Sequence, residues 1–176
     1  MGGQDSSDLA SVECYSPPTD TWALKAPLLG VRSHHAVVAM EDHSLYALGG
    51  YNGSTLKTCE RYSLSENTWA PVASMSVARY GLAAASLGGM IYAVGGEGGT
   101  RKEVERYSPS EDKWERVADL GTGRYGLGAA VVNNRLYAVG GWEGRKVVEV
   151  YNSEENTWAR EGDMSTARAY LAVVAV

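Results

Sequence analysis

The sequence contains no phenylalanine, and only 2 of its 176 residues are cysteine. Two cysteines, Cys14 and Cys59, are too few to form the disulfide framework on which many small secreted domains depend. We therefore expect both to be buried free thiols in a reducing compartment. The expected location is the cytoplasm, with the nucleus and the cytoskeleton as alternatives.

Long hydrophobic runs and a basic excess are also missing. The start of the chain lacks the charged and apolar regions of a signal peptide, and no apolar stretch approaches the roughly 20 residues that span a bilayer. The formal net charge is −5 at pH 7. Proteins that bind nucleic acid by neutralising phosphates usually carry a basic excess, so neither a membrane nor a nucleic acid is the expected partner.

Glycine and tyrosine are abundant, with 21 and 11 residues, and they recur in a fixed pattern. Glycine pairs follow one another at intervals of 47, 46 and 45 residues. A tyrosine stands seven residues before a tryptophan in every repeat, and an arginine stands ten residues after that tryptophan. The repeat marks are Gly2-Gly3, Gly49-Gly50, Gly95-Gly96 and Gly140-Gly141; Tyr15, Tyr62, Tyr107 and Tyr151; Trp22, Trp69, Trp114 and Trp158; and Arg32, Arg79, Arg124 and Arg168.

Short runs such as "MIYAVGG" and "VERYS" lie between these marks, and turn-forming residues bound them. No window has a sustained helical period. About four short strands in each period of about 45 residues predict an all-β fold, a propeller whose blades bury their faces against their neighbours. The tyrosine and tryptophan rings are expected to fill the gaps between blades, and their O–H and N–H groups to reach partners at the blade edge.

These marks resemble the kelch repeat. Segments such as "VERYSPSEDKWERVADL" and "RLYAVGG" are most similar to the propeller of the kelch-like substrate adaptors of cullin-3 ubiquitin ligases. The WD40 repeat would instead end its units in Trp-Asp, which this chain does not do. We interpret residues 1–176 as a single kelch-repeat domain. The resemblance implies BTB and BACK domains for cullin-3 binding, and neither is found in this sequence.

The number of blades departs from the resemblance, because kelch-like propellers commonly have six and this chain encodes about 3.75. The chain closes as a small four-bladed ring, or it is an incomplete part of a larger propeller. In the first case the segment "YLAVVAV" at the C-terminus would complete the N-terminal blade as its first strand. In the second case exposed blade faces would favour self-association.

The loops after the second and fourth strands of each blade are predicted to form one face, which is mildly basic and carries aromatic residues. Arginine and aromatic residues are enriched in interface hot spots, so a protein or peptide ligand is the expected partner, with an acidic peptide as one candidate. The family resemblance places ligand contacts just after each glycine pair and at or just after each repeat arginine. The candidate residues are Gln4, Arg32, Ser33, Tyr51, Asn52, Arg79, Tyr80, Glu97, Arg124, Tyr125, Trp142 and Arg168. The alternative for the arginines is structural, as donors to backbone carbonyl groups of a neighbouring loop.

No catalytic residue, cofactor site or metal site is predicted. The stretch "GTGRYG" matches G-x-G-x-x-G, but it does not open a helix after a strand, so we interpret it as a repeat loop. His34 and His35 would point to opposite faces of a strand, one toward the channel mouth and the other toward a neighbouring blade. This is poor geometry for holding one metal ion.

Three functions follow from this interpretation. The first is a module that recognises a partner or degron peptide for a cullin-3 ubiquitin ligase. The second is a scaffold associated with actin. The third is a sugar-processing enzyme of kelch fold, which is the least favoured because the predicted first strands are mostly Ala, Val, Leu and Gly rather than polar.

Overall fold

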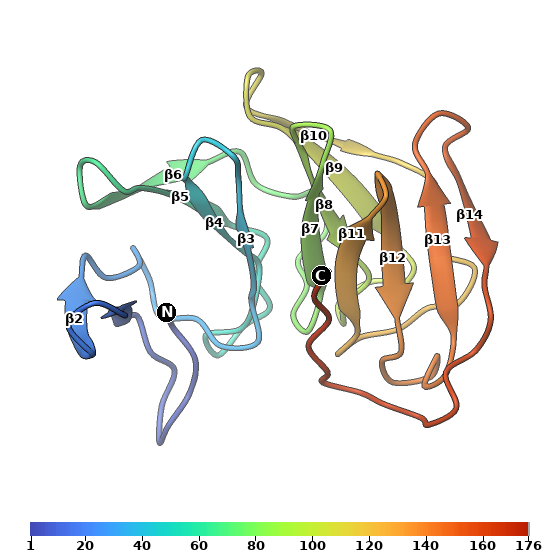
Figure 1. Ribbon diagram of the computed structural model, residues 1–176, viewed down its shortest axis with the longest axis horizontal. Coiled ribbons are helices and arrows are strands. Elements are labelled where there is room, and N and C mark those ends of the chain that lie inside the picture. Colours follow the sequence, from blue (N-terminus) through green and yellow to red (C-terminus); the bar gives the residue numbers. More distant parts are fainter. Residues whose placement is uncertain (176) are drawn as a thin grey trace.

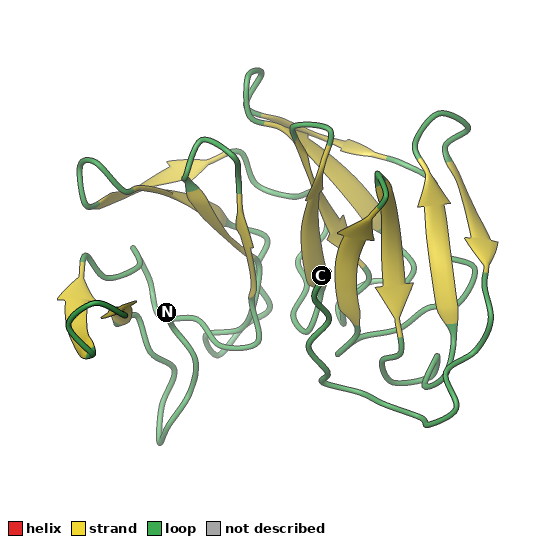
Figure 2. Cartoon of the chain, in the orientation of Figure 1, coloured by secondary structure: helices red, strands yellow, loops and turns green. Residues whose placement is uncertain are grey.

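The chain forms strands and loops in the computed structural model, which describes residues 1–175 (Figures 1 and 2). In that range, no helix has the length and apolar character needed to cross a membrane. The strands are β1 (Val12–Ser16), β2 (Thr21–Lys25), β3 (Ala36–Ala39), β4 (Leu45–Leu48), β5 (Cys59–Ser63), β6 (Thr68–Val72), β7 (Ala83–Leu87), β8 (Met90–Val94), β9 (Val104–Ser108), β10 (Lys113–Arg116), β11 (Gly128–Val132), β12 (Arg135–Val139), β13 (Val148–Asn152) and β14 (Thr157–Arg160).

The strands pair into three four-stranded antiparallel sheets and one two-stranded sheet. The sheets follow the chain as β3-β4-β5-β6, β7-β8-β9-β10 and β11-β12-β13-β14, preceded by the pair β1-β2. Figure 1 shows them as blades along an arc, and β7 packs against both β3 and β11. The all-β prediction and the four-strand period are confirmed, and the architecture is that of a partial propeller.

Each glycine pair allows a close approach between neighbouring blades. Gly49 and Gly95 have φ values of +59° and +61°, which L side chains rarely adopt. A Cβ atom at these positions would lie 2.5 and 2.6 Å from the carbonyl oxygens of Arg79 and Arg124. The predicted close backbone approach therefore occurs at the end of the second strand of the blade.

The tight turn between the third and fourth strands connects each blade to the one before it. Asn67 has a φ of +52° and its side-chain oxygen accepts the Tyr62 hydroxyl at 2.8 Å. The same oxygen accepts the backbone N–H of Ala26, and the Trp69 indole N–H donates to the Ala26 carbonyl at 3.0 Å. The next two blades repeat these bonds through Tyr107, Asp112, Trp114 and Ala73, and through Tyr151, Asn156, Trp158 and Ala118.

The rings of these repeat residues are buried or partly buried against a neighbouring blade, as predicted, except in the first repeat. Tyr62 and Trp69 are 3% and 7% exposed, whereas Tyr15 and Trp22 are 42% and 67% exposed. The difference arises because no blade of the described chain lies on the outer side of the β1-β2 pair. The burial prediction for the cysteines is likewise confirmed for Cys59 and wrong for Cys14, which is an exposed thiol on β1.

The arc does not close on itself. Residues 170–175 form no strand, and no backbone hydrogen bond in the described range joins them to β1 or β2. Instead, Leu171 and Val173 pack over Gly128 on β11, so the C-terminal segment lies inside the arc (Figure 1). The expectation that "YLAVVAV" completes the N-terminal blade as a strand is therefore wrong for residues 170–175, and Val176 lies outside the described residues.

Candidate functional site

The loop face predicted from the repeat is assembled by short backbone bridges. Ser33 and Tyr51 exchange two backbone hydrogen bonds of 2.9 Å, and Tyr80 and Glu97 exchange bonds of 3.0 and 2.8 Å. In the last blade, the Trp142 N–H donates to the Tyr125 carbonyl at 2.9 Å. These bonds bring the predicted ligand-contact residues that follow the glycine pairs next to those that follow the repeat arginines.

Four aromatic side chains form a ring at the centre of this face. They follow one another as His34, Tyr80, Tyr125 and Tyr170, with centroid distances of 6.1, 6.5 and 6.2 Å, and a distance of 6.3 Å between Tyr170 and His34 closes the set. A chain of backbone bonds underlies the ring, from Gly81 to His34, from Gly126 to Gly81, and from Tyr170 to Gly126. The ring presents a platform of polar-edged aromatic surface.

His34 and Tyr170 were not among the predicted binding residues. Both stand two residues after a repeat arginine, where the other two repeats have Gly81 and Gly126, and all four have positive φ. The sequence feature that could have identified them is an aromatic residue at a repeat position where a positive φ favours glycine. His34 is exposed on the loop face, and it precedes β3 rather than lying within a strand as expected.

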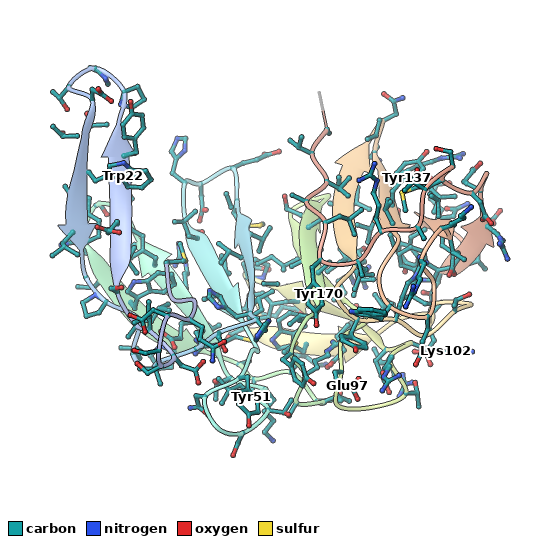
Figure 3. All side chains as sticks on the ribbon, turned by 90° about the horizontal axis from the view of Figure 1, so that it is seen from below. Trp22, Tyr51, Glu97, Lys102, Tyr137 and Tyr170 are labelled. Carbon is teal, nitrogen blue, oxygen red and sulfur yellow. The ribbon has the colours of Figure 1, made fainter. Side chains whose placement is uncertain are left out.

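Tyr51 and Trp142 extend the aromatic surface from the ring to its rim. Tyr51 packs edge-on against Tyr80 at 5.9 Å, and the Arg145 guanidinium lies 4.3 Å from the centre of the Trp142 ring. Both aromatic side chains remain about one third exposed, at 37% and 36%. Figure 3 shows Tyr51, Glu97 and Tyr170 on the same side of the molecule, with Lys102 near its edge.

The repeat arginines occupy different positions from the aromatic residues. Arg32, Arg79 and Arg124 are 2%, 0% and 0% exposed, and their side chains point into the joint with the following blade. There they form ion pairs with three buried glutamates and donate to nearby backbone carbonyls. The pairs are Arg32 with Glu60, Arg79 with Glu105 at 2.7 Å, and Arg124 with Glu149 at 2.6 Å.

Burial lowers the pKa of the Arg79 guanidinium, and the charges of Glu105 and Glu103 oppose that effect. Burial also lowers the pKa of Arg124, against the opposite effect of Glu149. An arginine keeps its proton under such conditions, so both pairs are ionic. These three arginines match the structural alternative, and their side chains are not available to a ligand on the surface.

The remaining charges make the loop face less basic than predicted. Arg101 pairs with Glu97 at 2.7 Å and with Glu143, and its guanidinium lies 5.3 Å from the Tyr125 ring centre. On this face, the basic side chains that form no ion pair within residues 1–175 are Lys57, Lys102, Arg145, Lys146 and Arg168. Of the other candidate residues, Gln4, Asn52 and Arg168 are exposed and Ser33 is buried.

His35 lies beneath this face and packs against the first blade. A Cβ atom on Gly2 would lie 2.7 Å from the His35 ring, and neither ring nitrogen has a hydrogen-bond partner among the described residues. Burial, followed by the charge of Arg32, lowers the pKa of His35 to about 4. His35 is therefore a neutral packing residue at pH 7, which confirms the prediction that it faces a neighbouring blade.

Because of His35, we expect stability to fall as the pH is lowered from about 6.5 to 4. Below pH 6.5 the unfolded chain binds a proton on this histidine while the folded chain does not, so folding is penalised progressively. A difference of about 2.5 pKa units corresponds to about 3 kcal/mol. Urea unfolding at several pH values should show this loss in the wild type, and His35→Leu should reduce it.

The matched control is His34→Leu, because it removes the neighbouring histidine, which is exposed rather than packed against the first blade. Equal slopes for the wild type and His35→Leu would contradict the assignment.

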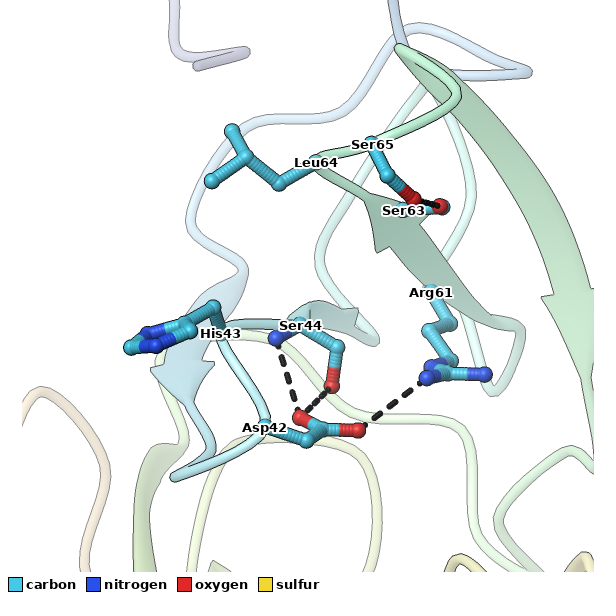
Figure 4. A pocket seen from close by; sticks show the side chains of 7 residues that line it. All are labelled: Asp42, His43, Ser44, Arg61, Ser63, Leu64 and Ser65. Atoms are coloured by element: carbon cyan, nitrogen blue, oxygen red, sulfur yellow. Dashed lines mark hydrogen bonds and ion pairs between the residues drawn. The ribbon is translucent and has the colours of Figure 1, made fainter.

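The opposite face carries a separate hollow between the β3-β4 and β5-β6 loops (Figure 4). Its lining residues are Asp42, His43, Ser44, Arg61, Ser63, Leu64 and Ser65. The Asp42 carboxylate already accepts the Ser44 N–H at 2.9 Å, the Ser44 hydroxyl, and an Arg61 N–H at 3.1 Å. These polar groups satisfy one another, so the hollow offers a ligand fewer unpaired groups than the aromatic face.

In residues 1–175, no three His, Cys, Asp or Glu side chains come together in an arrangement that could hold a metal ion. The convergent chemistry of the structure is that of aromatic rings and basic side chains on the loop face. Such a surface can bind a ligand by stacking and by charge-assisted hydrogen bonds.

Comparison with known proteins gives the same repeat unit. The family model described as "Kelch motif" matches residues 1–29, 32–76, 78–121 and 123–165. Human Kelch-like protein 33 is 39% identical over 100 residues, which cover 54% of this chain and 19% of that protein. Human Kelch-like protein 21 is 37% identical over 103 residues, covering 55% and 17% of the two chains.

Rat Kelch-like protein 7 is 33% identical over 89 residues, which are 50% of this chain and 15% of that protein. The matched region therefore spans less than a fifth of each of these relatives.

Proposed function

Because this chain belongs to the kelch-repeat family, we propose that it recognises a protein partner or degron peptide on its aromatic loop face. The similarity to kelch-like proteins supports a protein-interaction domain. The observation that carries the proposed location is the ring of His34, Tyr80, Tyr125 and Tyr170. Tyr51 and Trp142, each partly exposed, extend this aromatic surface at its rim.

The proposed ligand is an extended, acidic peptide from a protein partner. Aromatic side chains bury large areas with little loss of conformational freedom, which is why they dominate interface hot spots. Lys102, Arg145 and Lys146 lie on the loops beside the ring, and they form no ion pair among the described residues. These groups would pair with carboxylates of the peptide, while the buried repeat arginines hold the loops in place.

More specifically, we propose that the recognised protein is a substrate of a cullin-3 ubiquitin ligase in the cytoplasm. This rests on the similarity to kelch-like proteins rather than on a group in the site. Cullin-3 would be reached through BTB and BACK domains, so this domain alone would recognise a substrate without delivering it. An actin-associated scaffold is the alternative, and an actin co-sedimentation assay with the purified chain separates the two.

The expected result of removing the rim aromatics is loss of partner binding. Truncating an aromatic hot-spot residue typically costs about 2 kcal/mol or more of binding free energy. We expect the double variant Tyr51→Ala, Trp142→Ala to lose the proteins and acidic peptides that the wild type captures. Affinity capture with mass spectrometry identifies them, and titration with a captured peptide measures the change.

A matched double variant on the opposite face, Leu64→Ala with Val132→Ala, removes two exposed apolar side chains that are 59% and 40% exposed. It should bind as the wild type does. If the opposite-face variant lost the partners and the aromatic variant kept them, the site would lie on the wrong face.

A further inference from the structure

The two ends of the arc carry the two halves of one blade-to-blade joint. At each internal joint, a repeat arginine of one blade enters the next blade and meets a glutamate that stands two residues before the repeat tyrosine. The chain has four such arginines and four such glutamates, but only three pairs form among residues 1–175. Arg168 at the C-terminal end and Glu13 at the N-terminal end are the unused members.

The N-terminal end carries the groups that are equivalent to those that accept an arginine at the internal joints. In the internal joint, Arg79 donates to the carbonyls of Gly95 and Glu103 and to the Glu105 carboxylate. The corresponding groups of the first repeat are the carbonyls of Gly2 and Ser11 and the carboxylate of Glu13. The backbone bond from Gly2 to Ser11, at 2.9 Å, has its counterpart in the bond from Gly49 to Thr58 at 3.1 Å.

The C-terminal end presents the complementary groups in the same backbone geometry. The Arg168 N–H donates to the Arg145 carbonyl at 2.9 Å, as the Arg124 N–H does to the Arg101 carbonyl at 2.8 Å. Arg124 is fully buried against the next blade, whereas Arg168 is exposed. Ser165 stands at the repeat position of Gly121, whose N–H donates to the Glu149 carboxylate.

The tryptophan contact is split between the two ends in the same way. The Tyr15 hydroxyl donates to the Asp20 carboxylate at 2.7 Å. Asp20 occupies the repeat position of Asn67 and Asp112, each of which accepts a backbone N–H from the preceding blade. Trp22 is exposed beside it. At the other end, Gly162 stands four residues after Trp158, in the place of Ala26, Ala73 and Ala118, whose backbone groups contact the next blade. The backbone N–H and C=O of Gly162 are equivalent to the groups that bond to the turn residue and the tryptophan at the internal joints. Within residues 1–175, Asp20 and Trp22 have no such partner from a preceding blade.

Apolar surface accompanies these polar groups on both ends. On the C-terminal blade, Tyr137 and Val148 are only partly buried, whereas the equivalent Tyr92 and Val104 are 2% and 0% exposed against the next blade. On the N-terminal end, Tyr15 and Trp22 are exposed and stack on one another at 5.3 Å. Figure 3 shows Trp22 and Tyr137 at the two ends of the arc.

We propose that the chain associates head to tail, with the C-terminal end of one copy docked on the N-terminal end of a second copy. Arg168 of one copy pairs with Glu13 of the other, and Gly162 meets Asp20 and Trp22. The partner is a second copy because the chain repeats this contact three times within itself, with the same donors, acceptors and charges. Such an interface is heterologous, so it builds dimers and larger assemblies rather than a self-complementary pair.

Charge reversal tests the pairing directly. Sedimentation equilibrium should give a mass that rises above the 18.8 kDa of one chain as the concentration increases. Arg168→Glu alone and Glu13→Arg alone each place like charges in the joint, so each should weaken association at least about tenfold. An equimolar mixture of the two variants restores opposite charges at both possible joints, and it should associate as strongly as the wild type.

Two controls separate the joint from general effects of charge and folding. Lys57→Glu makes the same change of charge on an exposed residue away from both ends, and it should associate as the wild type does. Unfolding curves verify that the variants are folded. A wild-type chain that stays monomeric at high concentration would overturn the proposal, as would single reversals that associate normally or a mixture that remains dissociated.

Discussion

Replacing Arg79 with methionine is expected to lower the free energy of unfolding by about 3 to 5 kcal/mol. The Arg79 and Glu105 side chains are 1% and 2% exposed, and their charged groups are 2.7 Å apart. Removal of the arginine leaves the glutamate charge buried without its partner, which costs more than the ion pair contributes. Urea denaturation at pH 7 measures the difference.

The double variant Arg79→Met, Glu105→Leu should recover a large part of the lost stability, because both charges are then absent from the joint. Arg61→Met is the matched control, since the Arg61 and Asp42 side chains are 47% and 56% exposed. An exposed pair contributes up to about 1 kcal/mol, so little change is expected there. A small effect of Arg79→Met alone would show that the pair is not needed to hold the joint.

This result also governs how binding experiments are designed. Weaker partner binding by a variant that removes Arg79 or Arg124 would reflect its lower stability as well as any contact with a ligand. The rim residues Tyr51 and Trp142 avoid this ambiguity because they are partly exposed and lie outside the buried joints.

The second large effect is expected at the repeat tryptophans, and it should differ between repeats. Trp69→Ala removes a ring that is 7% exposed and a hydrogen bond to the Ala26 carbonyl, so it should cost about 3 to 5 kcal/mol. Trp22→Ala removes a ring that is 67% exposed, so it should cost less than about 1 kcal/mol in the monomer.

Thermal or urea unfolding of the two variants at low concentration makes the comparison, because self-association would add stability to the wild type. The same residue at the same repeat position is then tested with and without a neighbouring blade. Equal losses for Trp22 and Trp69 would mean that the first repeat is enclosed in solution, either by ring closure or by association.

Much of the fold could be predicted because the signals are local and repeated. The alternation of short apolar runs with turn residues predicts strands, and the spacing of tyrosine and tryptophan places both rings across the same hairpin, as Tyr62 and Trp69 show at 5.1 Å. The first glycine of each pair marks a position where a Cβ atom would lie 2.5 to 2.7 Å from a carbonyl oxygen. These properties depend on a few neighbouring residues, and they recur in every blade.

The binding face was predicted less completely because its chemistry depends on contacts between blades. The repeat arginines were candidates for ligand contact, yet stacking of the blades brings Arg32, Arg79 and Arg124 against buried glutamates. A glutamate two residues before each repeat tyrosine was a visible signal of this pairing. The central ring was also missed in part, since His34 and Tyr170 meet only where the inner ends of separate blades converge.

The sequence by itself determined the repeat unit, the all-β class and the residues that join one blade to the next. Only the tertiary structure decided which of these residues are satisfied. Arg124 and Arg168 occupy the same repeat position, but one is buried and the other is exposed, because a blade follows the first and none of the described blades follows the second. Each repeat carries the residues for both of its joints, but the curvature of the arc keeps the C-terminal arginine away from the N-terminal glutamate.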